Sequence, residues 1–556
     1  MNDSMETEDS ENSPYAGRWI ARVRGKVVAQ GASPEEARLA AKAHRHKEKM
    51  EIVYMLDSTG KMKIPIFDEV LAAIPEEQDI YLVGGAVRDM LMGRISHDFD
   101  FAVPSNGIRL GRRVANELNA AFYPLDDERD TGRVILSQKD GRRIVMDFVA
   151  YRGTSLDEDL RARDFTINSL AFDLRHQTLT DPLNGAHDIQ NKIIRVDSET
   201  TFTDDPVRVL RAVRQAAELG FQIDLGTRQK MKQAGARLRN VSPERLRDEL
   251  FRILEGRKPG SAIRALDMLG VLPYILPELS TLKGVEQSQP HVYDVWSHTI
   301  AVLQHLENNL SVLAPGYDPE STGDLFTSLL VLKLGRYRER FADHFANAPN
   351  ADRSLRALLF LAALYHDVAK PDCLVKDDTG RIRFWGHDER GAGLVSKRAE
   401  EFNLSNQEVE RLRVVVKNHM RIHFHSIRLE NEGKTPSRKA VYRFFRDTGK
   451  ASVDLVMLAL ADTRATYGHE LTEGTWAAVL DVCRIFLENY WEKPEETVAP
   501  PPLLNGHQLM SALDLKPGPK VGELLEAIRE AQATGKISIR EEALTFAREL
   551  LNNSNS

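Results

Sequence analysis

The chain has 556 residues, and its 75 lysines and arginines against 82 aspartates and glutamates leave a formal net charge of −7. An apolar fraction of 42% with 28% charged residues is ordinary for globular proteins and excludes wholesale disorder and fibrous repeats. No run of about 18 apolar residues occurs, and the N-terminus is acidic, so we expect no membrane span and no secretory signal. The two cysteines exclude a disulfide scaffold and a cysteine-ligated zinc site, which together favour a cytoplasmic, multidomain protein.

The N-terminal part of the chain predicts a small appendage ahead of the first large domain. Residues 1–16 are acidic and polar, which predicts a disordered tail. Residues 17–56 predict two strands, a helix with Ser33 as N-cap and Pro34 at its first position, and a returning strand. We assign no chemistry to this ββαβ appendage.

Residues 62–200 alternate between short strands and helices and contain three acidic residues in strand patterns. In HDFDFAV the strand period of two places Asp98 and Asp100 on one face. Neighbouring carboxylates repel each other unless a cation neutralises them, and hard oxygen ligands at this spacing suit Mg²⁺. Asp147 lies among apolar residues of RRIVMDFVAYR, where an unpaired carboxylate would be costly. A D-x-D pair by itself is also typical of a solvated strand face.

Upstream of these acids, a glycine pair ends one predicted strand and begins a helix. In YLVGGAVRD, Gly84 and Gly85 would let the backbone approach phosphate groups, which a helix N-terminus also attracts. The same helix carries Arg88 and Asp89. Taken alone, the glycine pair is equally consistent with a tight turn.

After residue 200 the periodicity becomes helical and the local charge changes sign. Residues 205–264 carry 14 lysines and arginines against 7 aspartates and glutamates. A basic segment in an acidic protein indicates a polyanion such as nucleotide phosphates or RNA, although a solvated helix face has the same composition.

These segments, in this order, resemble the class II tRNA nucleotidyltransferase and poly(A) polymerase family of the polymerase-β superfamily. The similar motifs are GGAVRD with HDFDF, then RDFTINSLAF, DPLNGAHDIQNKIIRV, DDPVRVLRAVRQAAELGF and SPERLRDELFRIL. The resemblance implies template-independent addition of C and/or A, from CTP and ATP, to the 3′ end of tRNA, with two metal ions and release of pyrophosphate.

The resemblance also implies roles for individual residues. Asp98 and Asp100 would bind the catalytic Mg²⁺, with Asp147 as the third carboxylate. The nucleotide-binding residues would be Gly84, Gly85, Arg88, Asp89, Arg163, Asp164, Asn168, Asp204, Asp205, Arg208, Arg211 and Arg214. The family reads the base with Glu-Asp-x-x-Arg, whereas this chain has Asp at the first of these positions.

A second group of metal-type residues lies in the helical region 276–490. His366 and Asp367 follow an apolar helix, so both side chains are expected at one buried end. Imidazole and carboxylate together suit Mn²⁺, Fe, Co²⁺ or Ni²⁺, with Mg²⁺ also possible. A lone histidine here is more often structural, and we interpret His291 and His305 in that way.

The ordered motifs HVYDVWSHT, YHD, GHD, KNH and LADT resemble the HD phosphohydrolase domain. Several bacterial tRNA nucleotidyltransferases carry such a domain after the helical segment, called the neck, that follows their catalytic head. The resemblance implies hydrolysis of a phosphomonoester or cyclic phosphodiester by a metal-activated water. One metal would need four of the matching residues, and the other two could complete a second site. The first four are His298, His366, Asp367 and Asp462, and the other two are His387 and His419.

We therefore predict an α+β, multidomain fold. A polymerase-β-like head, in which helices pack on a mixed sheet, would be followed by an all-α neck, an HD domain and a helical tail. The expected ranges are 62–200 for the head, 201–275 for the neck, 276–490 for the HD domain and 500–556 for the tail. The tail follows the proline-rich segment VAPPPLL and resembles the family's C-terminal segment, where it would either bind an RNA arm or only pack.

Three alternatives remain at this point. A poly(A) polymerase, or an enzyme that adds only CC or only A, shares these motifs. A phosphohydrolase whose transferase half merely binds nucleotides, or a non-catalytic RNA-binding protein, would have little need for three acids of metal-binding type.

Overall fold

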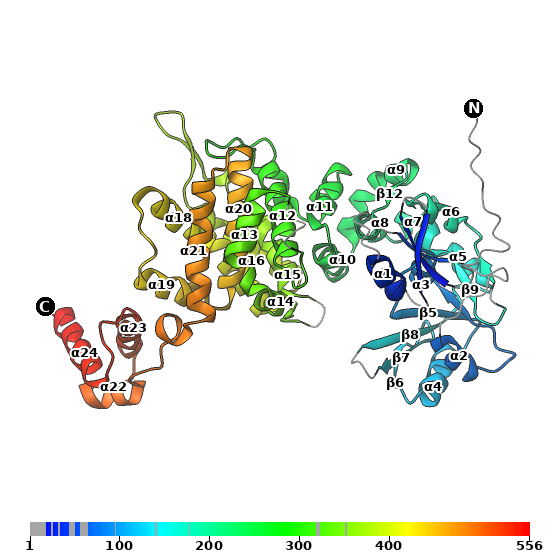
Figure 1. Cartoon of the computed structure of the whole chain (residues 1–556), viewed down its shortest axis with the longest axis horizontal. Helices are drawn as coiled ribbons and strands as arrows, with labels where there is room; N and C mark the ends of the chain where they lie inside the picture. Colours follow the sequence, from blue (N-terminus) through cyan, green and yellow to red (C-terminus); the bar gives the residue numbers. More distant parts are fainter. Residues whose placement is uncertain are drawn as a thin grey trace. The chain divides into compact units, whose positions relative to one another are not determined.

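Figure 1 shows the chain as a computed structural model, and the chain divides into two compact units, Met1–Ala234 and Gly235–Ser556. The structure describes residues 18–23, 26–31, 34–43, 51–55, 65–94, 96–138, 142–176, 178–318, 323–350 and 353–555. The expected acidic tail and the expected cap Ser33 lie outside these residues.

Unit 1 begins with a three-stranded antiparallel sheet in the order β2-β1-β3. Its elements are β1 (Arg18–Val23), β2 (Lys26–Gly31), α1 (Pro34–Ala43) and β3 (Glu51–Met55). Helix α1 packs on β1 and β2. Ile20 and Ala37 are among the side chains buried there, so this appendage has a small core of its own.

A seven-stranded mixed sheet forms the main part of unit 1, in the order β10-β9-β4-β5-β8-β7-β6. The strands are β4 (Tyr81–Val83), β5 (Asp98–Val103), β6 (Ala121–Asp126), β7 (Thr131–Ser137), β8 (Arg143–Ala150), β9 (Ala171–Asp173) and β10 (Leu179–Thr180). Strands β5 and β8 run parallel, and the other neighbouring pairs are antiparallel. Sequence patterns did not predict β6, β9 or β10, because β6 is a largely exposed edge strand and the other two are very short.

The register between β5 and β8 separates apolar from acidic side chains. Phe101 is opposite Phe148, and their rings stack with centroids 5.0 Å apart. Phe67 of α2 (Pro65–Ala72) meets the ring of Phe99 edge-on at 5.2 Å. These rings are buried, so the alternating residues of β5 lie on the opposite face of the sheet.

Short helices make up most of the rest of unit 1. They are α3 (Gly85–Leu91), α4 (Gly107–Glu117), α5 (Leu156–Arg161), η2 (Thr166–Asn168), α6 (Gly185–Gln190), α7 (Thr201–Asp204), α8 (Arg208–Leu219) and α9 (Leu225–Ala234). Helix α4 packs on β7 and β8. The expected neck, 201–275, contains the boundary between the units. Helix α8 packs with β11 (Ile193–Ile194) and β12 (Gln222–Ile223) in unit 1, while α10 (Pro243–Glu255) packs with α15 (Leu355–Tyr365) in unit 2.

The described part of unit 2 is helical apart from one hairpin that sequence patterns did not predict, β13 (Leu374–Lys376) with β14 (Ile382–Phe384). Its longer helices are α10 (Pro243–Glu255), α11 (Pro259–Met268), α12 (Val295–Val312), α13 (Leu325–Leu334), α14 (Arg338–Ala346), α15 (Leu355–Tyr365), α16 (His387–Glu401), α17 (Asn406–Asn418), α18 (Met420–Glu432), α19 (Arg438–Thr448), α20 (Ser452–Tyr467) and α21 (Glu473–Trp491). Helices α15 and α20 are buried on nearly every side and form its core. No helix in the described ranges is long and apolar enough to cross a bilayer.

The last three helices have a hydrophobic core of their own. Helices α22 (Gly506–Leu513), α23 (Pro519–Ala533) and α24 (Arg540–Asn555) bury Leu509 and Leu524 together with other residues of the same segment. Charged side chains join α23 to α19, as in the ion pair at 2.7 Å between Glu530 and Arg443. The predicted succession of a mixed sheet with helices and then a helical region is confirmed.

Two candidate active sites

The three predicted acids of unit 1 lie together on the open face of the sheet. Asp98 and Asp100 alternate along β5, and Asp100 is directly opposite Asp147 of the parallel strand β8. The first two are exposed, and Asp147 is half-buried. Protein atoms around Asp100, together with the charges of Asp147 and Asp98, raise the pKa of its carboxyl group, although Arg163 opposes this. Mutually repelling carboxylates with hard oxygen donors fit Mg²⁺.

An arginine that sequence reasoning missed holds the third acid in place. Arg133 of β7 donates two hydrogen bonds to Asp147, at 2.8 and 2.7 Å. This bidentate contact raises the pKa of Arg133 and fixes the plane of the carboxylate. Asp147 therefore already has a charge partner, and the residues Asp98 and Asp100 are exposed beside it.

A glycine lets a second arginine approach the acids. Gly84 has a backbone φ of 71°, and a Cβ atom there would lie 3.0 Å from Nη1 of Arg163 and 3.7 Å from Oδ2 of Asp100. Arg163 is held from behind by Asp159, at 2.8 Å. The strand end thus places a guanidinium beside the carboxylates, in the position where phosphate charge would need a partner. Gly85, the next residue, begins α3 and lies against the Arg88 guanidinium.

A chain of hydrogen bonds connects several of the predicted nucleotide-binding residues. Arg88 donates to Asn168 at 2.8 Å, and Asn168 donates to Asp164 at 2.8 Å. Asp164 in turn pairs with Arg211 of α8 at 2.8 Å. Asp89 pairs with Arg88, so this guanidinium is held on two sides. The network joins α3, η2 and α8 and presents alternating cationic and anionic groups.

The expected base-reading residues lie at the start of α8. Arg208 is 3.9 Å from Asp205 and donates to the backbone carbonyl of Ala162 at 3.2 Å, beside Arg163. This contact brings the Asp-x-x-Arg motif to the segment that also carries the phosphate-type arginine. An arginine supplies donors and an aspartate acceptors, which together match the hydrogen-bonding edge of a base.

Two other predicted residues, Asp204 and Arg214, have contacts with neighbours close in the sequence. Asp204 accepts a hydrogen bond from the Thr200 hydroxyl at 2.7 Å, within its own short helix. Arg214 pairs with Glu218 one turn further along α8, at 3.2 Å. Both of these contacts are local, four residues apart in the sequence.

In unit 2, three predicted histidines share one hydrogen-bonding pattern. In His366, His387 and His419, Nδ1 lies 2.7, 2.8 and 2.6 Å from the backbone carbonyl three residues earlier. A carbonyl oxygen only accepts, so Nδ1 carries the ring proton and the Nε2 lone pair points away from the backbone. Such backbone contacts typically orient metal-ligating imidazoles.

These Nε2 atoms converge on one carboxylate. They lie 3.1 Å (His366), 3.4 Å (His387) and 3.7 Å (His419) from oxygens of Asp367, while His298 Nε2 lies at 3.5 Å. Two groups of three have all their ligand atoms within 4.8 Å of one another, and Asp367 belongs to both. All of these side chains are buried. The structure thus brings five of the six predicted metal ligands together.

Converging lone pairs and a buried carboxylate need a cation. His366 and Lys370 hold the pKa of Asp367 well below its usual range, even though burial alone would raise it. Burial lowers the pKa of His366, but Asp367 more than offsets this and raises it, while burial lowers the pKa of His419 to about 3. A neutral His419 imidazole beside an ionised carboxylate fits a divalent transition metal.

The sixth predicted ligand lies next to this cluster. Asp462 of α20 is 3.0 Å from His298 Nε2 and 2.8 Å from Nε2 of His423. It belongs to neither group of three, and it contacts the cluster at His298. His423 was missed, although it lies one helical turn after His419.

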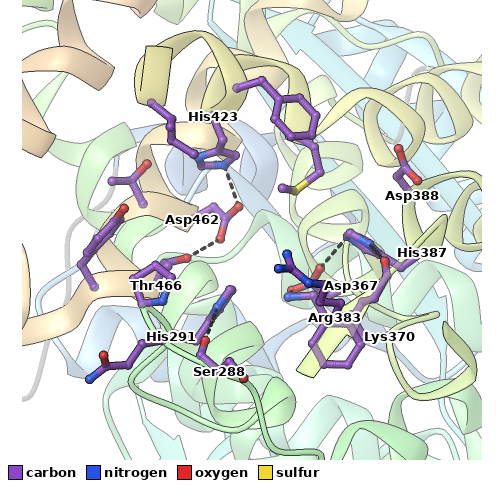
Figure 2. Close-up of a pocket in the computed structure, with 18 of the residues that line it drawn as sticks. Ser288, His291, Asp367, Lys370, Arg383, His387, Asp388, His423, Asp462 and Thr466 are labelled. Carbon is purple, nitrogen blue, oxygen red and sulfur yellow. Dashed lines mark hydrogen bonds and ion pairs between the residues drawn. The ribbon is translucent and has the colours of Figure 1, made fainter. Parts of the chain in front are cut away.

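A cavity of about 460 Å³ opens beside the cluster. Figure 2 shows Asp367 and His387 on one side of it and Asp462, His423 and His291 on the other. Lys370 also lines it and lies 2.7 Å from Asp367. Asp367, His387 and Asp462 are thus accessible from a pocket large enough for a small ligand.

Three segments of the chain match known family models. Residues 80–195 match the poly A polymerase head domain, 220–282 match the model named "Probable RNA and SrmB-binding site of polymerase A", and 499–547 match domain 2 of tRNA nucleotidyltransferases. None of the three covers residues 283–498, which contain the histidine cluster.

Similar proteins agree with these matches. The chain is 34% identical to the A-adding tRNA nucleotidyltransferase of Deinococcus radiodurans over 473 residues, which is 84% of this chain and 94% of that protein. It is 32% identical to the CC-adding tRNA nucleotidyltransferase of Thermus thermophilus, over 84% of this chain and 93% of that one. A solved CCA-adding enzyme shares the fold, with a TM-score of 0.54 at 21% identity over 88% and 93% of the two chains. The chain belongs to the class II tRNA nucleotidyltransferase and poly(A) polymerase family, which confirms the resemblance of its first half.

Proposed function

We propose that this nucleotidyltransferase extends the 3′ end of tRNA with C and/or A from CTP and ATP, releasing pyrophosphate. The main support is the register of β5 and β8, which places Asp98, Asp100 and Asp147 side by side next to Arg163. The names of the relatives in Deinococcus and Thermus support tRNA as the acceptor.

In this mechanism Asp98 and Asp100 would hold Mg²⁺, and Asp147 would be kept in line by Arg133. Bound Mg²⁺ supplies the positive charge that makes the terminal ribose hydroxyl more acidic and stabilises the leaving pyrophosphate. Arg163 would bind phosphate oxygens close to the acids.

Base selection would fall to Asp205 and Arg208 at the start of α8. Their acceptors and donors would pair with the edge of the incoming base in place of a nucleic-acid template. The network of Arg88, Asn168 and Asp164 would orient the ribose and phosphates of the same nucleotide.

The test uses tRNAs that end before CCA, after C and after CC, each incubated with CTP alone, ATP alone and both. Addition that stops after one terminal A, after CC or after a full CCA supports the proposal. The three outcomes distinguish A-only, CC-only and complete addition. Unlimited ATP chains on any RNA would instead indicate a poly(A) polymerase. No incorporation from either nucleotide would overturn the proposal.

We also propose that unit 2 carries a metal-dependent phosphohydrolase. Its support is the convergence of lone pairs from His366, His387 and His419 on Asp367. These residues and His298 would hold two divalent transition metals, which when bound lower the pKa of a coordinated water. Lys370, beside Asp367, would bind an oxygen of the phosphate ester.

This second activity is tested with His366→Ala combined with Asp367→Ala. We expect loss of phosphoesterase activity and of transition metal, measured by elemental analysis, with unchanged nucleotide addition. Phosphoesterase activity in the double variant equal to that of the wild type would refute this assignment.

A further inference from the structure

A buried pair of amides adjoins the nucleotide-binding network of unit 1. Gln215 of α8 is 5% exposed and Asn168 of η2 is 6% exposed, and the Asn168 amide nitrogen donates to the Gln215 amide oxygen at 3.1 Å. The same nitrogen donates to Asp164, while the Asn168 oxygen accepts from Arg88. Gln215 is thus a buried polar residue in direct contact with the network, and the mechanism proposed above gives it no role.

The chemistry of the neighbouring groups decides which way both amides face. A guanidinium only donates and a carboxylate only accepts, so Asn168 turns its oxygen to Arg88 and its nitrogen to Asp164. The second N–H of that nitrogen needs an acceptor, which Gln215 supplies. Because the pair is buried, losing this acceptor would leave a donor unpaired. Gln215 therefore stabilises the amide orientation in which Asn168 holds Arg88.

Gln215 is also one of two points that join α8 to the segment 164–168. Arg211, one helical turn earlier, pairs with Asp164 at 2.8 Å. The two contacts are four residues apart on one side of the helix, which is about 6 Å along its axis. A helix held at one point can pivot, whereas two points fix its rotation and its axial position. Arg208, seven residues before Gln215, lies on the same side of α8.

We propose that Gln215 is a positioning residue for base selection, which acts by fixing Asn168 and, with it, the place where α8 presents Asp205 and Arg208. This role rests on the nucleotide addition proposed above and concerns its specificity. The phosphates of the incoming nucleotide would be held from other elements, by Arg163 among others, so a shift of α8 would move the base-reading groups relative to them. A displacement of about 1 Å can cost about 100-fold in rate. Loss of the Gln215 oxygen should therefore reduce discrimination between bases more than it reduces the rate with the correct nucleotide.

The experiment compares the full-length wild type with Gln215→Met, which has a side chain of similar length without an acceptor, and Gln215→Glu, which keeps an acceptor. Addition of one nucleotide to truncated tRNA is measured with CTP, ATP, UTP and GTP, and kcat and KM are determined for each. The discrimination ratio is kcat/KM for the nucleotide that the wild type adds, divided by kcat/KM for UTP or GTP. We expect this ratio to fall about 10- to 100-fold in Gln215→Met. Gln215→Glu should retain most of it.

Two further comparisons make the result specific. Gln233→Met makes the same change at an exposed glutamine of α9 and should keep the wild-type ratio. Asn168→Ala tests whether Gln215 acts through Asn168. This variant should itself lose discrimination, and adding Gln215→Met to it should change the ratio by less than about twofold, because the contact between the two side chains is already absent. Thermal unfolding of each variant shows whether the chain is folded.

An unchanged ratio in Gln215→Met overturns the proposal. An equal loss of kcat/KM with all four nucleotides also overturns it, since a purely structural role would act in that way. Effects that multiply in the double variant contradict a role through Asn168. If Gln215→Met does not fold, Gln215→Asn, which is one methylene shorter, is measured in its place and judged by the same ratio.

A failure of the proposed nucleotide addition is distinguishable from a failure of this role. If the wild type adds no nucleotide to any tRNA, the proposed addition fails, and calorimetric binding of CTP, ATP and UTP in the presence of Mg²⁺ decides the role of Gln215. A selectivity among the three nucleotides that falls in Gln215→Met supports the positioning role, and equal selectivity in wild type and variant overturns it.

Discussion

The two candidate active sites, the acids of unit 1 and the histidine cluster of unit 2, differ in how the charge of their carboxylates is balanced. On the sheet of unit 1, Asp98 and Asp100 face solvent, and the guanidinium groups of Arg133 and Arg163 lie beside the group. In unit 2, Asp367 is buried among imidazole rings whose lone pairs face it. An open site suits a metal that arrives with a nucleotide and leaves with pyrophosphate, whereas a buried one suits a resident metal.

The largest effect should come from removing the open acids. In Asp98→Ala with Asp100→Ala, nucleotide addition should fall at least about 1,000-fold, because the metal's contribution of several kcal/mol is lost. Primer extension on truncated tRNA measures this. Asp157→Ala, which removes an exposed acid that pairs with Arg161, is the matched control and should retain activity. The proposed role is falsified if the double variant extends tRNA at the wild-type rate.

The buried site is best probed through its shared carboxylate. Loss of a residue that only supports a metal ligand typically lowers metal affinity by about 10- to 100-fold. Asp367→Asn changes a ligand itself, so we expect a larger loss of affinity for transition metal. Elemental analysis after dialysis measures the metal content. Asp372→Asn, five residues later and paired with Arg390 at the surface, should keep its metal. Nucleotide addition should be unaffected in both variants; a loss in Asp367→Asn alone would show that the sites are not independent.

Arg133 tests whether the position of Asp147 matters as much as its charge. We expect Arg133→Met to reduce nucleotide addition about 10- to 100-fold, since Asp147 loses both hydrogen bonds that orient it. Arg133→Lys should recover part of this, and the Mg²⁺ concentration for half-maximal rate should rise in Arg133→Met. Arg129→Met, a change at a highly exposed arginine nearby, should have little effect. Equal Mg²⁺ requirements in wild type and Arg133→Met would contradict a positioning role.

The smallest effect should come from Gly84. Gly84→Ala would place a methyl group 3.0 Å from Arg163 and adopt a positive φ, so we expect a stability loss of about 1 kcal/mol and about a tenfold slower addition. Gly220→Ala has nearly the same φ, 72°, and no atom within 4 Å of its added methyl group. Thermal unfolding should therefore shift similarly in both variants, while the addition rate should fall in Gly84→Ala alone.

The sequence was most informative where one strand or helix holds the chemistry. The two-residue period of β5 predicted that Asp98 and Asp100 share a face, and the apolar helix before His366 predicted its burial. Partners from other strands were not predictable, because Arg133 reaches Asp147 only through the pairing register of β7 and β8.

Other missed residues had weaker signals. Asp159 supports Arg163 from the preceding turn, and Gln215 contacts Asn168 from α8 at 3.1 Å. Neither residue type is unusual in a helix, so only the fold gives it a role. His423 had a usable signal, since it follows His419 by four residues on a helix that begins at the cluster.

The hydrogen-bond ladder between β5 and β8 has a consequence for how this protein can change over evolutionary time. The same pairing sets Asp100 against Asp147 and, one step on, Phe101 against Phe148. A single-residue insertion or deletion in either strand would turn aromatic rings toward water and acids toward the hydrophobic interior. Substitutions can therefore accumulate along these two strands, but length changes would remove stability and chemistry in one event.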